Sequence, residues 1–203
     1  MFTDKLGLSI NGDRASLQDQ TLTLSGMTWE DYEQLTKENY SSYRISYLNR
    51  VITILSPSQN HEIIERVISI LINAYCRKYR LIYFPMGSTT LKNPPLAGKE
   101  PDTSYSFCTK KSIPDLAIEV IYSSGNVGDS LTKYQYLGVK EVWFWNNDEI
   151  TFYYLIDSEY VEISCSNFLP ELSSNFLGSF VNRGLTESPL TIEEDFYQAL
   201  WIN

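Results

Sequence analysis

The chain has 203 residues, of which 43% are hydrophobic and 14% aromatic, and this composition excludes an intrinsically disordered protein. Its net charge of −9 disfavours non-specific binding to nucleic acid, because such binding depends on neutralising phosphates. No apolar run approaches the roughly 20 residues that a membrane span needs, so we expect no membrane partner. Three widely spaced cysteines and an N-terminus without a secretory pattern lead us to expect a cytoplasmic protein.

The N-terminal part of the chain has weak patterning. We interpret residues 1–26 as an N-terminal extension and residues 27–203 as a single domain, a length that can bury a sizeable core. Thr28 followed by Asp31 resembles a capping box, which predicts a short helix over 28–35.

The next stretch predicts strands and then the strongest helix of the chain. Residues 43–55 are rich in β-branched side chains and predict strands, with a turn at Asn49-Arg50. Ser56-Pro57-Ser58 is typical of a helix start. The helix that follows carries apolar residues at helical spacing, which predict a buried stripe: Ile64, Val67, Ile68, Leu71 and Tyr75.

The second half of the chain alternates strands and helices. The patterns predict strands over 81–84, 105–108, 114–121, 141–145 and 150–156, a loop over 94–98, and helices over 129–137 and 191–200. The strand–helix–strand order over 114–145 indicates a mixed α/β sheet with a right-handed crossover.

Two carboxylates in this half are candidates for a metal site. Glu119 lies within an apolar strand, and a buried carboxylate is costly unless it pairs or binds a metal. Asp115 lies roughly 13 Å away along the same strand, too far to share an ion. Asp102, which follows Glu100-Pro101 on a separate element, can approach Glu119 through folding. We therefore expect Asp102 and Glu119 to hold a divalent cation, against the alternatives of a loop aspartate and a structural glutamate.

The long helix adds two further candidates. His61, the one histidine of the chain, and Glu65 are four residues apart and share one helix face. Either side chain is a candidate to position a water molecule, and Glu65 or Glu62 is a candidate third acidic ligand. The alternative is a solvated pair on the polar face. Arg77, Lys78 and Arg80 form the densest basic cluster, for which a solvated helix end is the favoured interpretation. If the protein binds nucleic acid, this cluster is the expected surface.

Four segments in order resemble the Uma2 family: Leu48 to His61, Glu100-Pro101-Asp102, Pro114 to Val120, and the stretch from Tyr134 through Gly138-Val139-Lys140-Glu141-Val142-Trp143. The resemblance covers about residues 27–160. It implies a PD-(D/E)XK, restriction-endonuclease-like fold, in which helices flank a mixed β-sheet core. It also implies an endonuclease that uses Mg²⁺ or Mn²⁺ on nucleic acid, with DNA as the expected substrate and Asp102 and Glu119 as metal ligands.

The chain departs from this pattern at the catalytic lysine. Ile121 stands where a PD-(D/E)XK nuclease has lysine, and Ser130 stands where Uma2 members typically have one. Lys133, three residues later, is the candidate cation. The expected catalytic set is Asp102, Glu119, Lys133, Glu65 and His61. The alternative is a catalytically degenerate, dimeric interaction module that uses an aromatic sheet edge at Trp143-Phe144-Trp145, and we expect a homodimer.

Overall fold

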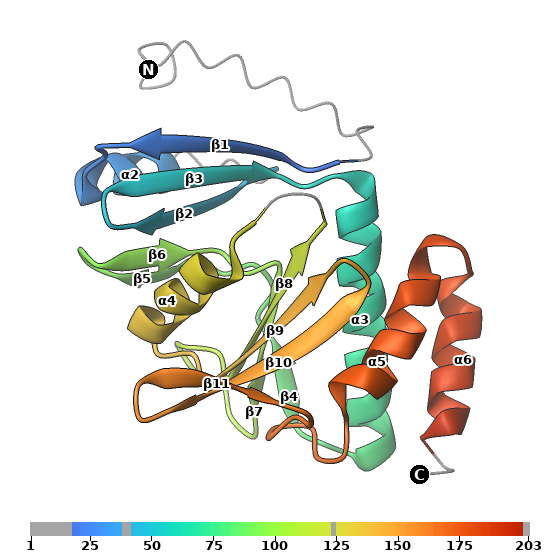
Figure 1. Ribbon diagram of the computed structural model, residues 1–203. Helices are drawn as coiled ribbons and strands as arrows, with labels where there is room; N and C mark the ends of the chain where they lie inside the picture. The colour runs from blue at the N-terminus through green and yellow to red at the C-terminus, as the bar shows by residue number, and fades with distance from the viewer. Residues whose placement is uncertain (1–17, 38–41, 123–124, 201–203) are drawn as a thin grey trace.

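A computed structural model describes residues 18–37, 42–122 and 125–200 (Figure 1). Its first sheet has the strand order β1-β3-β2-β6-β5, and its second has the order β11-β10-β9-β8-β7-β4. The strands are β1 (Gln20–Ser25), β2 (Arg44–Leu48), β3 (Val51–Ser56), β4 (Tyr83–Pro85), β5 (Leu91–Asn93), β6 (Ala97–Lys99), β7 (Thr103–Phe107), β8 (Leu116–Ile121), β9 (Glu141–Asn146), β10 (Glu149–Ile156) and β11 (Glu159–Ile163). The helices are α2 (Trp29–Lys37), α3 (Gln59–Tyr79), α4 (Val127–Leu137), α5 (Ser174–Val181), η1 (Asn182–Leu185) and α6 (Pro189–Ala199).

The first sheet is built around the hairpin of β2 and β3. Asn49 and Arg50 both have positive φ angles, of 49° and 64°, as a two-residue hairpin turn requires. Strand β1 pairs antiparallel with β3 along its whole length, from Gln20 opposite Ser56 to Ser25 opposite Val51. The last residues of the predicted extension therefore form an edge strand of this sheet.

The second sheet is mixed, as the strand–helix–strand pattern predicts. Strand β8 pairs antiparallel with β7 and parallel with β9, and α4 connects the two parallel strands. All six residues of β8 are buried, which explains its nearly continuous apolar sequence.

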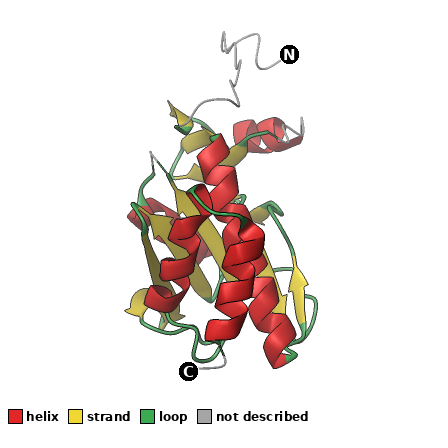
Figure 2. Cartoon of the chain, turned by 90° about the vertical axis from the view of Figure 1, so that its right-hand side faces the viewer, coloured by secondary structure: helices red, strands yellow, loops and turns green. Residues whose placement is uncertain are grey.

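Helices cover both faces of the second sheet (Figure 1). Leu116, Ile118 and Val120 of β8 belong to the core cluster that contains residues of α3, α5 and α6. Ala117 and Ile121 belong to a separate cluster with residues of α4. A view from the side of α3 shows the long helices standing in front of the strands (Figure 2). The side-chain alternation of β8 thus sends successive residues into two different environments.

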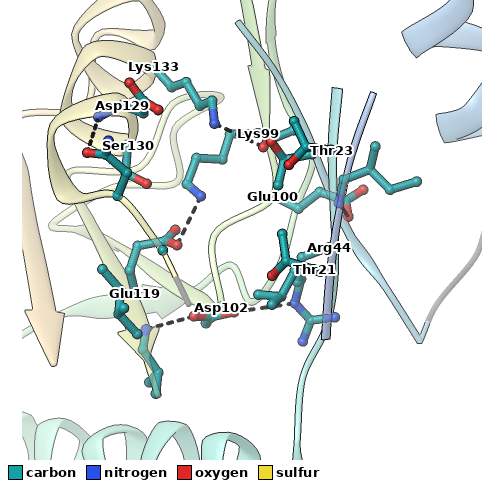
Figure 3. A pocket seen from close by; sticks show the side chains of 18 residues that line it. Thr21, Thr23, Arg44, Lys99, Glu100, Asp102, Glu119, Asp129, Ser130 and Lys133 are labelled. Carbon is teal, nitrogen blue, oxygen red and sulfur yellow. Dashed lines mark hydrogen bonds and ion pairs between the residues drawn. The ribbon is translucent and has the colours of Figure 1, made fainter. Parts of the chain in front are cut away.

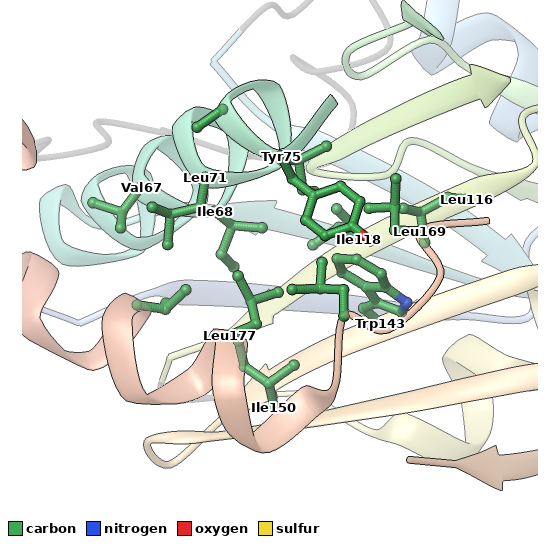
Figure 4. Packing of buried hydrophobic residues seen from close by; sticks show 14 of the residues in the cluster. Val67, Ile68, Leu71, Tyr75, Leu116, Ile118, Trp143, Ile150, Leu169 and Leu177 are labelled. Carbon is green, nitrogen blue, oxygen red and sulfur yellow. The ribbon is translucent and has the colours of Figure 1, made fainter. Parts of the chain in front are cut away.

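Helix α3 begins two residues later than a cap at Ser56 predicts. Its N-cap is Ser58, whose hydroxyl accepts a hydrogen bond from the backbone nitrogen of His61 over 3.3 Å. The predicted apolar stripe is buried, and Figure 4 shows it packed against β8 and β9: Val67, Ile68, Leu71 and Tyr75 on α3, with Leu116, Ile118 and Trp143 on the strands.

The elements β5, β6, β11 and α5 were not predicted, and one surface is corrected. The hairpin of β5 and β6 replaces the expected loop over 94–98, and β11 and α5 lie in a stretch without clear periodicity. Trp143, Phe144 and Trp145 are 1%, 1% and 3% exposed, because β9 lies between β8 and β10. They are core residues, so the expected aromatic sheet edge is wrong.

In the ranges that the structure describes, no helix has both the length and the apolar character of a membrane span.

Candidate active site

A cavity of about 280 Å³ lies where the first sheet meets β8 and the first turns of α4 (Figure 3). Strands β1, β2, β3, β6 and β8 and helix α4 all contribute to its wall. Its charged and hydroxyl side chains are Thr21, Thr23, Arg44, Ser46, Thr53, Lys99, Glu100, Asp102, Glu119, Asp129, Ser130 and Lys133. Asp102 and Glu119, which the sequence places on separate elements, therefore line one cavity.

Glu119 is held at both carboxylate oxygens. It lies on the α4 side of β8 and is 7% exposed. Lys99 Nζ is 2.9 Å from Oε2, and the Tyr134 hydroxyl donates a hydrogen bond to Oε1. Burial, together with the charge of Asp102, raises the pKa of Glu119, although Lys99 and Tyr134 act in the opposite direction. A divalent cation at this position would therefore favour the ionised carboxylate.

Asp102 is fixed by groups from three elements. Its Oδ2 accepts a hydrogen bond from the backbone nitrogen of Val120 over 2.8 Å. Its Oδ1 lies 3.1 Å from His61 Nε2 and 3.7 Å from Arg44 Nε. Burial alone would raise the pKa of Asp102, but His61, the backbone hydrogen bond from Val120 and the charge of Arg44 together hold the pKa below its ordinary value. Asp102 is thus a stable carboxylate.

His61 lies behind Asp102 and is not among the residues that line the cavity. Its Nδ1 is 3.1 Å from Asp19 Oδ2, so the imidazole lies between two carboxylates. Burial alone would lower the pKa of His61, but Asp102 and Asp19 raise it to about 10. The ring is therefore positively charged at neutral pH and supports Asp102 instead of contacting the cavity.

Glu65 is also absent from the cavity wall. Its Oε1 accepts a hydrogen bond from the Ser69 hydroxyl over 2.9 Å, and Ser69 in turn accepts one from the Tyr105 hydroxyl. Glu62, the alternative carboxylate, is half exposed and lies 3.8 Å from Arg44. Among the described residues, no group of three or more His, Cys, Asp or Glu side chains is arranged to hold a metal. Neither Glu65 nor Glu62 lines the cavity, so a third acidic ligand on α3 stays a prediction without support from the cavity lining.

The structure places Lys133 in the cavity wall together with Ser130. The Lys133 ammonium donates a hydrogen bond to Ser46 Oγ over 3.1 Å. Burial, reinforced by the charge of Lys99, lowers the pKa of Lys133 to about 8. A lysine therefore reaches this cavity from α4, one turn away from the position of Ser130.

Lys99 is the site residue that sequence reasoning missed. It ends β6 and directly precedes Glu100-Pro101-Asp102, so its position beside this segment was the available signal. Because a loop was expected over 94–98, the short strand β6, which directs the Lys99 side chain into the cavity, was not predicted. Ile121 leaves β8 without the usual lysine, and Lys99 brings an ammonium to Glu119 from a different sheet.

The basic cluster of Arg77, Lys78 and Arg80 lies elsewhere. It is at the C-terminal end of α3, roughly 24 Å from His61 at ~1.5 Å rise per residue. Arg77 forms an ion pair with Glu193 of α6. The basic groups that line the cavity are instead Arg44, Lys99 and Lys133, so the expected basic surface is not part of the cavity.

A mixed sheet with two buried carboxylates and a lysine at one cavity defines a protein of the restriction-endonuclease-like class. The chain belongs to the Uma2 family, whose model, described as "putative restriction endonuclease", matches residues 29–186. A crystal structure of a "putative nuclease belonging to DUF820" from Anabaena variabilis ATCC 29413 is similar in fold, with a TM-score of 0.56 and 15% sequence identity. The similarity covers 76% of this chain and 99% of that one. The comparison with curated proteins finds no match.

Proposed function

We propose that this protein is a Mg²⁺-dependent endonuclease that hydrolyses phosphodiester bonds of nucleic acid, with DNA as its substrate. The observation that carries the proposal is the convergence of two buried carboxylates, Asp102 and Glu119, and two lysines, Lys99 and Lys133, on one cavity. Family membership and the similar fold support it.

The donor set fits a magnesium ion. Mg²⁺ prefers oxygen ligands and is commonly bound by one or two carboxylates, with water and substrate phosphates as its remaining ligands. Asp102 and Glu119 would hold it, and the cavity leaves room for water. When bound, the ion supplies charge stabilisation at the phosphate and lowers the pKa of a water molecule. Mn²⁺ is the expected substitute.

Basic side chains of the protein would stabilise the negative charge of the phosphate together with the metal ion. Lys99 and Lys133 reach the cavity from two neighbouring elements, one from β6 and one from α4. Their ammonium groups are placed to bind phosphate oxygens and to stabilise the negative charge that grows in the transition state. Arg44 lines the same cavity beside Asp102 as a third cation. These three cations lie among four acidic side chains of the cavity wall, Glu100, Asp102, Glu119 and Asp129, so a bound divalent cation would add the positive charge that favours phosphate binding.

A cleavage assay with a matched control tests the proposal. Wild type should nick plasmid or cut single-stranded DNA at low salt with Mg²⁺ or Mn²⁺, and should lose this activity in EDTA. Glu119→Gln should abolish cleavage, because it removes the charge that holds the ion. Glu141→Gln is the control, since Glu141 is equally buried but bonds to Trp143 and Asn167 away from the cavity. Equal background activity in wild type and Glu119→Gln would remove the nuclease proposal.

The alternative, a degenerate dimeric interaction module, has lost the surface on which it was based, because Trp143, Phe144 and Trp145 are buried. Homodimer formation stays a prediction without an assigned surface. Sedimentation velocity of the purified protein, read as the mass of the main species against 23.4 kDa for one chain, tests it.

A further inference from the structure

The segment that precedes the matched family region contributes to the candidate site. The family model begins at residue 29, yet Thr21 and Thr23 of β1 line the cavity. Asp19, just ahead of β1, contacts His61. The active site of this chain is thus built partly from residues outside the family match.

Asp19 is completely enclosed at its side chain. Its carboxylate is 0% exposed, and the imidazole of His61 is 1% exposed. Asp19 Oδ2 lies 3.1 Å from His61 Nδ1, and Oδ1 accepts a hydrogen bond from the backbone nitrogen of Ser58 over 2.9 Å. Asp19 therefore fixes both the first turn of α3 and the ring that this turn carries.

The imidazole of His61 also contacts Asp102, the proposed metal ligand. His61 Nε2 lies 3.1 Å from Asp102 Oδ1, so Asp19, His61 and Asp102 form one buried row. A buried imidazole that has a carboxylate oxygen 3.1 Å from each of its nitrogens has little freedom to rotate or shift. A group that orients a ligand from behind in this manner commonly changes metal affinity or activity by roughly 10- to 100-fold when it is removed.

We infer that Asp19 is a positioning residue of the active site, which acts through His61 to orient Asp102. The inference is based on the proposed metal-dependent nuclease function. It makes the residue ahead of β1 a determinant of metal affinity, although Asp19 does not line the cavity.

The test compares Asp19→Ala, Asp19→Asn and a control substitution on the adjoining strand β1. Leu24→Ala is the control, because Leu24 packs on the cluster around Trp29 and Tyr32 and makes β1 less stable without contacting the row. Isothermal titration calorimetry with Mn²⁺ gives the Kd, cleavage of single-stranded DNA gives kcat and KM, and thermal unfolding shows that each variant folds.

Asp19→Ala should weaken Mn²⁺ binding by about 10-fold or more and lower kcat, with KM for DNA little changed. Asp19→Asn keeps the shape and an acceptor oxygen, so it should recover part of the affinity. Leu24→Ala should lower the unfolding temperature but leave the Mn²⁺ Kd unchanged.

Two outcomes would overturn the positioning role while leaving the nuclease proposal intact. The first is a wild type that binds Mn²⁺ and cleaves DNA alongside an Asp19→Ala variant with the same Kd and kcat. The second is equal loss in Asp19→Ala and Leu24→Ala, which would assign Asp19 to stability alone. A wild type that neither binds Mn²⁺ nor cleaves DNA would overturn the proposed function and the role of Asp19 with it.

Discussion

Asp102 accepts a hydrogen bond from the backbone nitrogen of Val120, the residue that follows Glu119, over 2.8 Å. This bond joins the residue ahead of β7 to the middle of β8. It ties the position of one candidate ligand to the backbone of the other, so the two carboxylates cannot move apart independently. Preorganisation of this kind lowers the cost of binding an ion between them.

Removing the hydroxyl that holds Glu119 should impair the site more than the fold. Tyr134→Phe deletes the donor to Glu119 Oε1 and leaves a buried carboxylate oxygen less satisfied. We expect a loss of about 1–3 kcal/mol in the free energy of unfolding and roughly 10-fold or more in cleavage. Tyr160→Phe is the matched control, because the Tyr160 hydroxyl donates to the Val139 carbonyl and not to a carboxylate. Equal cleavage by both variants would contradict the role of Tyr134.

Lys99→Met should destabilise the protein and abolish cleavage. The variant leaves Glu119 buried without the ammonium 2.9 Å from its Oε2. Removing one partner of a buried ion pair costs on the order of 3–5 kcal/mol. Urea unfolding at pH 7 measures this loss. An unchanged unfolding midpoint would show that the pair is not formed in solution.

Lys133→Met should have the opposite effect on stability. Burial and the charge of Lys99 lower the pKa of Lys133 from 10.5 to about 8. The protonated form of Lys133 is therefore less favourable in the folded state than in the unfolded state, which lowers the free energy of unfolding. At ~1.4 kcal/mol for each tenfold change in proton affinity, the cost is of order 3 kcal/mol at neutral pH. The variant should therefore unfold at higher urea concentration than wild type at pH 7, while cleaving DNA more slowly.

The pH dependence of this difference provides a separate check. Because the pKa of Lys133 is lower in the folded state, the cost is fully present below about pH 8 and disappears as the pH approaches 10.5. Wild type should thus gain stability relative to Lys133→Met between these values. Urea unfolding of both proteins from pH 7 to 10 measures it. A constant difference across this range would place Lys133 in solvent.

The local patterns were sufficient for much of the fold. The β-branched run of β3, the apolar face of α3 and the continuous apolar sequence of β8 predicted their elements, because burial dictates those side chains. Three-residue strands such as β5 and β6 have no detectable periodicity. They are stabilised by pairing, β6 with β2 and β5 with β6.

The sequence indicated those candidate site residues whose polarity differs from that of their neighbours. It did not indicate those whose neighbours are also polar. Glu119 is conspicuous in an apolar strand, and Asp102 follows from the resemblance. Lys99 and Asp19 are ordinary charged residues in sequence, and only tertiary structure brings them to Glu119 and His61. Glu65 and His61 share a helix face as predicted, but that face points behind the cavity.

The alternation of β8 separates two kinds of constraint within six consecutive residues. Leu116, Ile118 and Val120 point into the core with α3, whereas Ala117 and Ile121 flank Glu119 on the α4 side. Substitutions at the first three positions should therefore be limited by volume, and substitutions on the other face by charge and by access to the phosphate. Residues on the α4 side of β8 can therefore change in chemistry without repacking of the core on the other side. Ile121 at the usual lysine position, combined with Lys99 from β6, is one such change.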